Sequence, residues 1–324
     1  MIREMTRWLR YALAAASLIC SVNAFAAHFP SKTMTIVVPY GPGGAGDLTA
    51  RVFAKEFTKM YKVPVVVLNR PGPGFVNSAT LVAHSKPDGY TTFLFGNGTV
   101  IATQLFRSLP YKLSSFKQVS TIAFFDLVLV VNKGSQFKTV HDLIAWAKAH
   151  PGKLSIGTIS TGSTQNLAAD LFDSMAHIKA QVIPYTSTSE VITALRGNQV
   201  QAAFEIMPPI YGQIKAGVLK ALAVTGTSRF PGLPEVPTMA QSGLKGYNAT
   251  SWNGLAVPAK TPNAIVNTLS KEAAAVLATP EVQKGIEFLG AVARSGTPAE
   301  VTRRVRTEGV KWNRIITAAH IPRH

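Results

Sequence analysis

A glycine-rich segment near the N-terminus, Gly41–Asp47, points more directly to ligand chemistry than any other part of this chain. It follows the β-branched run Met34–Val38 and precedes the amphipathic segment Leu48–Tyr61, so we expect a strand, a loop and a helix. A loop of this kind directs backbone N–H groups and the positive end of a helix dipole at one point, which suits an anion. Main-chain donors are therefore expected from Gly43, Gly44, Ala45, Gly46 and Asp47.

A second loop of the same kind is expected in the middle of the chain, between a strand at Leu154–Gly157 and a helix at Gln165–Met175. Its hydroxyl side chains would add hydrogen bonds to carboxylate oxygens. Two facing helix N-termini would then hold an anion that carries carboxylate groups. The expected contributors are Thr161, Gly162, Ser163, Thr164 and Gln165, with Ser187 from a later loop.

Several candidate side chains also have a purely structural interpretation. Tyr40 and Phe75 either line the site of an aromatic ligand or pack in the core. Asn97 lies between two glycines, where it is either a turn residue or part of a loop facing the ligand. Asp47 either contacts the ligand or caps its helix and shapes the loop, and the sequence favours the second role.

Glu205 is an acidic residue expected beside this anion site. An ionised carboxylate would repel an anionic ligand there. Three roles stay open: pairing with a ligand ammonium group, binding through a water molecule, and capping the helix that begins near Pro208.

The chain does not show the spacing expected of a catalytic or metal site. Its seven histidines have no metal-ligand spacing, and the G-x-S-x-G motif is absent. We therefore expect no catalytic residue, no metal and no cofactor. An exported hydrolase is an alternative, and it would need a histidine beside Ser163, where Asn166 stands instead.

The glycine loop also satisfies the dinucleotide pattern G-x-G-x-x-G, and Arg70 could receive a 2′-phosphate. An NADP-binding oxidoreductase is therefore a second alternative. Against it, Asn69 stands where an acidic ribose ligand is usual, and Pro42 removes one backbone donor from the loop. Nicotinamide cofactors are also not expected outside the cytosol.

The elements that must position these residues alternate between strand and helix in two units, which predicts α/β lobes with mainly parallel sheets. The expected strands of the two units are Met34–Val38, Val63–Leu68, Thr91–Phe95, Leu127–Val131, Leu154–Gly157, Gln181–Ile183, Gln201–Phe204 and Ala221–Val224. The expected helices are Leu48–Tyr61, Asn77–Ala83, a capping-box helix from Thr139 to Ala149, Gln165–Met175, Glu190–Arg196 and Pro208–Lys215.

A last strand is expected at Trp252–Val257, followed by three helices whose starts share a Thr-Pro pair, with Thr261, Thr279 and Thr297 as caps. If these helices return to the first unit, the chain crosses between units twice. This predicts a two-lobed clamp with a ligand cleft between the lobes. Its domains would be residues 27–127 with 252–324, and residues 128–251.

The first 26 residues predict an export signal that is cleaved near Ala26. Arg3, Arg7 and Arg10 are basic, and Tyr11–Cys20 forms an apolar stretch too short to span a membrane. We therefore expect a periplasmic protein; a retained N-terminal anchor is the alternative.

Removing residues 1–26 takes away three arginines and one glutamate, so 33 basic and 16 acidic residues become 30 and 15, a net charge of +15. Cys20 is the only cysteine, so the mature chain would have no disulfide. Export argues against a nucleic-acid partner despite the charge. A weak field that favours anionic solutes remains.

Several motifs together resemble the Bug receptors, the extracytoplasmic solute-binding proteins of tripartite tricarboxylate transporters. The resemblance covers nearly the whole mature chain and is carried by FPSKTMTIVVPYGPGGAGDLTARVFAKEF, VVVLNRPGPG, PDGYT, LPYKLSSF, ALAVTGTSRFPGLPEVPTMAQSGLKGY and SWNGLAVPAKTP. It implies the type II periplasmic binding protein clamp. It also implies a small carboxylate ligand (an aliphatic di- or tricarboxylate, an acidic amino acid or an aromatic acid) and a membrane permease as partner for some members. We expect a monomer, because closure of a clamp needs no partner.

The departures from the family pattern fall on the expected cleft loops, so they bear on the identity of the ligand. Gln165 and Asn166 replace a usual Ser-His pair, Glu205 replaces an aspartate, and Phe75 replaces a glycine. The residues expected to contact ligand are Tyr40, Gly43, Gly44, Ala45, Gly46, Asp47, Phe75, Asn97, Thr161, Gly162, Ser163, Thr164, Gln165, Ser187 and Glu205.

Overall fold

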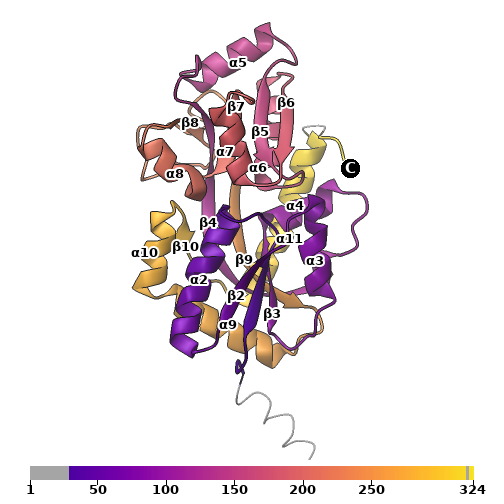
Figure 1. The fold of residues 1–324 in the computed structure, drawn as a ribbon. Helices are drawn as coiled ribbons and strands as arrows, with labels where there is room; N and C mark the ends of the chain where they lie inside the picture. The colour runs from indigo at the N-terminus through magenta and orange to yellow at the C-terminus, as the bar shows by residue number, and fades with distance from the viewer. Residues whose placement is uncertain (1–28, 319–320) are drawn as a thin grey trace, which may run out of the picture.

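The computed structural model describes residues 29–318 and 321–324, so the expected export signal lies outside the described residues. Figure 1 shows two lobes, one above the other, with β4 (Phe116–Asn132) and β9 (Thr250–Pro258) running between them. The strand order is β2-β1-β3-β9-β4-β7-β5-β6, and β8 and β10 also pair with β4.

The first lobe is built on a sheet of β1 (Met34–Val38), β2 (Val65–Asn69), β3 (Thr91–Gly96), β9, β10 (Val292–Ala293) and the first part of β4. Helix α2 (Ala45–Tyr61) packs with α9 (Asn263–Leu277) and α10 (Pro280–Phe288). A separate apolar cluster joins the sheet to α3 (Val76–Ala83) and α11 (Pro298–Ala318), and α11 also packs on α4 (Asn97–Leu105). Helices thus cover both faces (Figure 1).

The second lobe contains β5 (Ser155–Ile159), β6 (Gln181–Tyr185), β7 (Ala202–Ile206), β8 (Leu219–Val224) and the end of β4. Its helices are α5 (Val140–Ala149), α6 (Thr164–Ala176), α7 (Thr188–Arg196) and α8 (Met207–Lys215). Strand β7 is buried along its whole length. Short 3₁₀ turns at Pro73–Phe75 and Leu113–Ser115 complete the described elements.

Strand β4 belongs to both sheets. Residues 116–126 pair with β9, whereas residues 127–132 pair with β7 and β8. Every pairing made by β4 or β9 is antiparallel. Strand β1 pairs in parallel with β2 and β3, and strand β5 pairs in parallel with β6 and β7. The α/β two-lobed fold is therefore confirmed, but each sheet is mixed rather than mainly parallel, because the two crossing strands enter against the direction of their neighbours.

Three local expectations were wrong or incomplete. Thr261 does not cap α9: Pro262 holds the N-cap position and the buried Thr261 hydroxyl has no partner. Thr279 does cap its helix, accepting from the Val282 amide, and Thr297 accepts from the Glu300 amide. Helix α4 and residues 116–120 of β4 were not expected.

None of the helices in the described part of the chain has the length and apolar character needed to cross a membrane.

Candidate functional site

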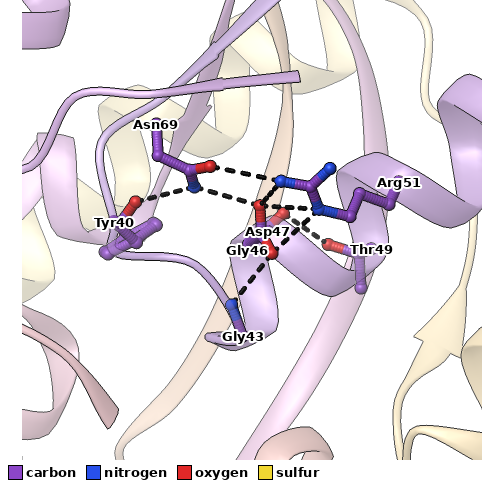
Figure 2. Close-up of polar contacts among 7 residues, drawn as sticks. All are labelled: Tyr40, Gly43, Gly46, Asp47, Thr49, Arg51 and Asn69. Atoms are coloured by element: carbon purple, nitrogen blue, oxygen red, sulfur yellow. Dashed lines mark hydrogen bonds and ion pairs between the residues drawn. The ribbon is translucent and has the colours of Figure 1, made fainter. Parts of the chain in front are cut away.

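The first glycine loop leads directly into α2, as the sequence predicts, and Asp47 holds it in shape (Figure 2). Asp47 is the third residue of the helix rather than its N-cap, which is Gly44. Its buried carboxylate accepts a hydrogen bond from the Gly43 amide at 2.9 Å and pairs with the Arg51 guanidinium at 2.9 Å. Asn69 bridges this carboxylate (3.0 Å) to the carbonyl oxygen of Tyr40 (2.9 Å).

The partners of Asp47 favour its ionised form. Burial alone would raise the pKa of Asp47, but the hydrogen bonds from Arg51, the Gly43 amide and Asn69 outweigh burial and lower that pKa below its usual value. The Asp47 carboxylate thus stabilises the loop and uses its hydrogen-bonding capacity within the protein. The Gly43 N–H is used internally, but at the start of α2 the amides of Gly44, Ala45, Gly46 and Asp47 have no partner among residues 29–318.

The second loop leads into α6 and is also held by its own side chains. Ser163 is the N-cap: its hydroxyl accepts from the Asn166 amide at 3.0 Å and donates to the Ile159 carbonyl oxygen at 2.7 Å. Asn166 in turn accepts from the Gly162 amide at 3.1 Å. The Ser163 hydroxyl is therefore occupied, while the amides of Thr164 and Gln165, in the first turn of α6, have no partner in the described chain.

A third helix N-terminus, that of α7, faces the same place. Ser187 caps this helix by accepting from the Glu190 amide at 3.3 Å. Its loop touches the first lobe, since a methyl group built on Gly41 would lie 3.0 Å from the Ser187 Cβ. The sequence predicted Ser187 as a hydroxyl donor but did not predict that a whole helix end would point into the site.

These helix ends enclose a small cavity between the lobes, with room for only about 20 Å³, close to that of one water molecule. Within residues 29–318 and 321–324, no lysine, arginine, histidine, aspartate or glutamate lines it. Its polar character comes from amides, hydroxyls and helix dipoles, which favour an anion. The lining residues are Tyr40, Gly41, Gly44, Ala45, Gly46, Phe125, Ile159, Gln165, Thr186, Ser187, Thr188, Ile206, Ser251, Trp252 and Asn253.

The predicted site residues divide into two groups around this cavity. Six of them line it: Tyr40, Gly44, Ala45, Gly46, Gln165 and Ser187. The other nine do not line it, namely Gly43, Asp47, Phe75, Asn97, Thr161, Gly162, Ser163, Thr164 and Glu205. Phe75 is fully buried and packs edge-on against Tyr40, with ring centroids 5.4 Å apart, so it supports a lining residue.

Asn97 joins the lobes instead of forming a turn. It begins α4 and is fully buried. Its Oδ1 accepts from the Trp312 indole at 2.8 Å, and its Nδ2 donates to the Thr164 hydroxyl in the second lobe at 3.2 Å. The Thr164 hydroxyl also lies 3.1 Å from that of Ser251 on β9. This chain of side chains holds the lobes together beside the cavity.

Glu205 lies at the end of β7 beneath the cavity and is buried. Its Oε2 accepts from the Ile206 amide at 3.2 Å, from the Thr188 hydroxyl at 3.3 Å and from the Gln165 side-chain amide at 3.4 Å. Burial raises the pKa of Glu205 to about 7. Two of its three partners are thus cavity-lining side chains.

Some lining residues were not predicted. Thr186 and Thr188 flank Ser187 just after the end of β6, so the argument that predicted Ser187 as a site residue could have been applied to them too. Strands β4 and β9 contribute further lining residues where they cross between the lobes, namely Phe125, Ser251, Trp252 and Asn253. The sequence alone does not indicate that these residues line a cavity, because their position depends on how the two lobes are arranged.

A family model described as the tripartite tricarboxylate transporter family receptor matches residues 49–321. Among curated relatives, the protein BugT of Bordetella pertussis is 31% identical over 307 residues, covering 94% of each chain.

Solved structures of other binding proteins have the same fold as this chain. The periplasmic binding protein BugD superposes with a TM-score of 0.87 at 27% identity, covering 91% of this chain and all of that one. Rpa4515 of R. palustris with adipate superposes with a TM-score of 0.87 at 30% identity, covering 91% of this chain and 99% of that one. MatC of Rhodopseudomonas palustris with bound malate superposes with a TM-score of 0.84 at 27% identity, covering 89% of this chain and 100% of that one.

The dinucleotide alternative is not favoured, because a cavity this small between two lobes is unlike an open cofactor crevice and the matches are to receptors. With most of its length matched by the family model and its fold shared with these binding proteins, the chain belongs to the receptor family of the tripartite tricarboxylate transporters.

Proposed function

We propose that this protein is an exported receptor that captures a small organic carboxylate between its lobes and delivers it to a permease of the tripartite tricarboxylate type. One observation carries the proposal: the N-termini of α2, α6 and α7 converge, from both lobes, on one cavity that no charged residue of the described chain lines. Unpaired amides at helix N-termini bind carboxylate oxygens well. The receptor would act by binding rather than by catalysis.

The ligand class follows from the same cavity. Amides of Gly44–Asp47 would hold one carboxylate group and those of Thr164 and Gln165 another, with the Ser187 loop between them. The adipate and malate of the two similar structures are dicarboxylates, which supports this class. Tricarboxylates, acidic amino acids and aromatic acids remain within the proposed range.

Ligand entry requires the lobes to move apart, because a cavity of about 20 Å³ is too small for a dicarboxylate. We propose that the movement is a hinge motion about β4 and β9, with residues 27–127 and 252–324 as one domain and residues 128–251 as the other. The change of pairing partner along β4 at Asp126–Leu127 supports this division. We further propose that the leader is cleaved near Ala26 and that the periplasmic receptor is a monomer.

A thermal-shift screen of residues 27–324 tests the proposed function. The panel is malate, adipate, citrate, glutamate, nicotinate and NADP. A carboxylate at 100 times its Kd should add about 2.7 kcal/mol and raise the Tm by several degrees. We expect at least one carboxylate to do so and NADP to have no effect. A shift with NADP alone would overturn the receptor proposal in favour of the glycine fingerprint.

A further inference from the structure

Glu205 has an unequal set of partners for a buried carboxyl group. Its Oε2 accepts three hydrogen bonds of 3.2–3.4 Å, whereas its buried Oε1 has no partner among the residues that the structure describes. A buried carboxylate anion normally needs strong hydrogen bonds or a cation. Glu205 has long bonds on one oxygen and none on the other, so its surroundings stabilise the ionised form only weakly and make it easy to protonate.

The side chain of Gln165 connects Glu205 to the cavity. Gln165 lines the cavity and donates from Nε2 to Glu205, and its carbonyl Oε1 accepts no hydrogen bond from the described residues. An ionised carboxylate can only accept, so it fixes the amide with the NH₂ group toward Glu205. The group left for the cavity is then a carbonyl oxygen, which repels a carboxylate.

We propose that Glu205 takes up a proton when a carboxylate ligand binds, and that the Gln165 amide then turns over to present its NH₂ group to the ligand. This inference rests on the proposed function. A proton on Oε2 converts Glu205 into a donor toward the Gln165 carbonyl oxygen. Rotation about the terminal side-chain bond exchanges the oxygen and the nitrogen with little other movement, because that torsion is broad and roughly two-fold. The proton comes from solvent.

In the described part of the chain, no charged side chain other than Glu205 controls its protonation. Burial raises the pKa of Glu205 to about 7, and the hydrogen bonds from Gln165, the Ile206 amide and Thr188 only partly oppose it; no neighbouring charge contributes. Strand β7 packs against β4, β5, α6, α7 and α8. The titratable and charged side chains of these elements are Lys117, Asp126, Asp170, Asp173, Glu190, Arg196, Tyr211 and Lys215, and none of them affects the pKa of Glu205.

The consequence is a receptor whose affinity depends on pH. A ligand anion disfavours ionised Glu205 through like-charge repulsion, so the bound state keeps the proton to higher pH. With a free pKa of about 7 that ligand binding raises further, the affinity should fall by up to about tenfold between pH 6 and pH 8. The neutral form would select ligands with a carboxylate at the Gln165 position.

Calorimetric titration with malate and adipate at pH 6, 7 and 8, in two buffers of different ionisation enthalpy, tests the inference. We expect net proton uptake on binding at pH 8, little uptake at pH 6, and a Kd that rises with pH by up to about tenfold. Glu205→Gln should bind at pH 8 within about threefold of the native affinity at pH 6 and take up no proton, because a neutral amide can donate to Gln165 at any pH. Ionisation of the ligand itself affects both proteins equally and cancels.

Glu272→Gln is the matched control, because Glu272 lies on α9 of the first lobe and burial also raises its pKa to about 7. This variant should keep the native pH dependence of binding. Binding without proton uptake, with the same Kd at pH 6 and 8, would overturn the inference and leave the proposed function standing. Absence of binding by native protein and Glu205→Gln at every pH would overturn both. The two-buffer measurement on native protein decides the matter even where Glu205→Gln does not fold.

Discussion

Gly46 is the residue whose substitution most directly tests the cavity. A methyl group there would lie 2.6 Å from Tyr40 Cδ2 and 2.9 Å from Leu94 Cδ2, so the ring that lines the cavity would have to move. We expect Gly46→Ala to weaken malate or adipate binding at least tenfold and to cost about 1–3 kcal/mol of stability. Calorimetry and urea unfolding measure both quantities.

Gly212→Ala provides the control for this substitution. Gly212 lies exposed on α8, and a Cβ there would meet nothing within 4 Å. The variant should keep its affinity and gain up to about 1 kcal/mol, because alanine favours helix. If Gly46→Ala binds as tightly as Gly212→Ala, the ligand does not occupy this cavity.

For individual residues, the sequence predicted where the loops lie but not which groups form hydrogen bonds within them. Residue types at Gly43 and Ser163 correctly indicate loops before helices, yet the Gly43 amide donates to Asp47 and the Ser163 hydroxyl is shared by Asn166 and Ile159. Which polar group remains free for a ligand depends on such partners. Spacing alone does not determine them, because loop-shaping and ligand-binding groups are of the same chemical types.

Among the elements, α4 and α6 meet across the lobes through Asn97 and Thr164. Thr164→Val removes the hydroxyl that accepts from Asn97 and contacts Ser251. The loss of such a hydrogen bond costs about 0.5–1.5 kcal/mol, and we expect it to fall on the closed form. Malate or adipate affinity should then weaken roughly two- to tenfold, with a larger radius of gyration by small-angle scattering.

Thr158→Val separates this effect from a general loss of a buried hydroxyl. The Thr158 hydroxyl, on β5 in the second lobe, is buried and has no partner. Its replacement by valine should leave both affinity and shape unchanged. Equal behaviour of the Thr164 and Thr158 variants would mean that the Asn97 contact does not influence closure.

Most elements could be predicted, and the failures have physical causes. Strand β1 begins and ends where its β-branched run does, and the Thr139–Asp142 capping box starts α5 as expected. Helix α4 begins with a Gly-Asn-Gly sequence typical of turns, and packing against α11 stabilises it. The first part of β4 contains Lys117, Gln118 and Ser120 and looks like a surface segment, but β9 pairs with it.

For the molecule as a whole, three buried or half-buried carboxyl groups make stability depend on pH. Burial raises the pKa values of Asp170, Glu205 and Glu272 to about 7, from ordinary values of 3.8 and 4.5. A raised carboxyl pKa means that the folded state holds the proton more tightly. Its stabilising contribution is full below the ordinary pKa and is lost as pH rises to about 7.

We therefore expect the urea midpoint to fall between pH 5 and pH 7 and to level off above pH 8. Glu272→Gln should raise the midpoint at pH 8 and change it little at pH 4.5, because the amide carries no charge to bury. Glu281→Gln is the control: Glu281 is exposed and pairs with Lys59 at 3.4 Å, so its loss should give no gain at pH 8. A Glu272→Gln gain that is equal at both pH values would contradict this interpretation.

The position of β9 between β3 and β4 has a consequence for how the chain can be assembled as it is made. The strands of the second sheet are all complete before β9 begins at Thr250, so that lobe can form on a growing chain. The first sheet cannot: until β9 arrives, β3 and β4 expose unpaired edges that are templates for wrong pairing. A cell making this protein must shield a half-built first lobe until β9, which ends at Pro258 of the 324 residues, has been made.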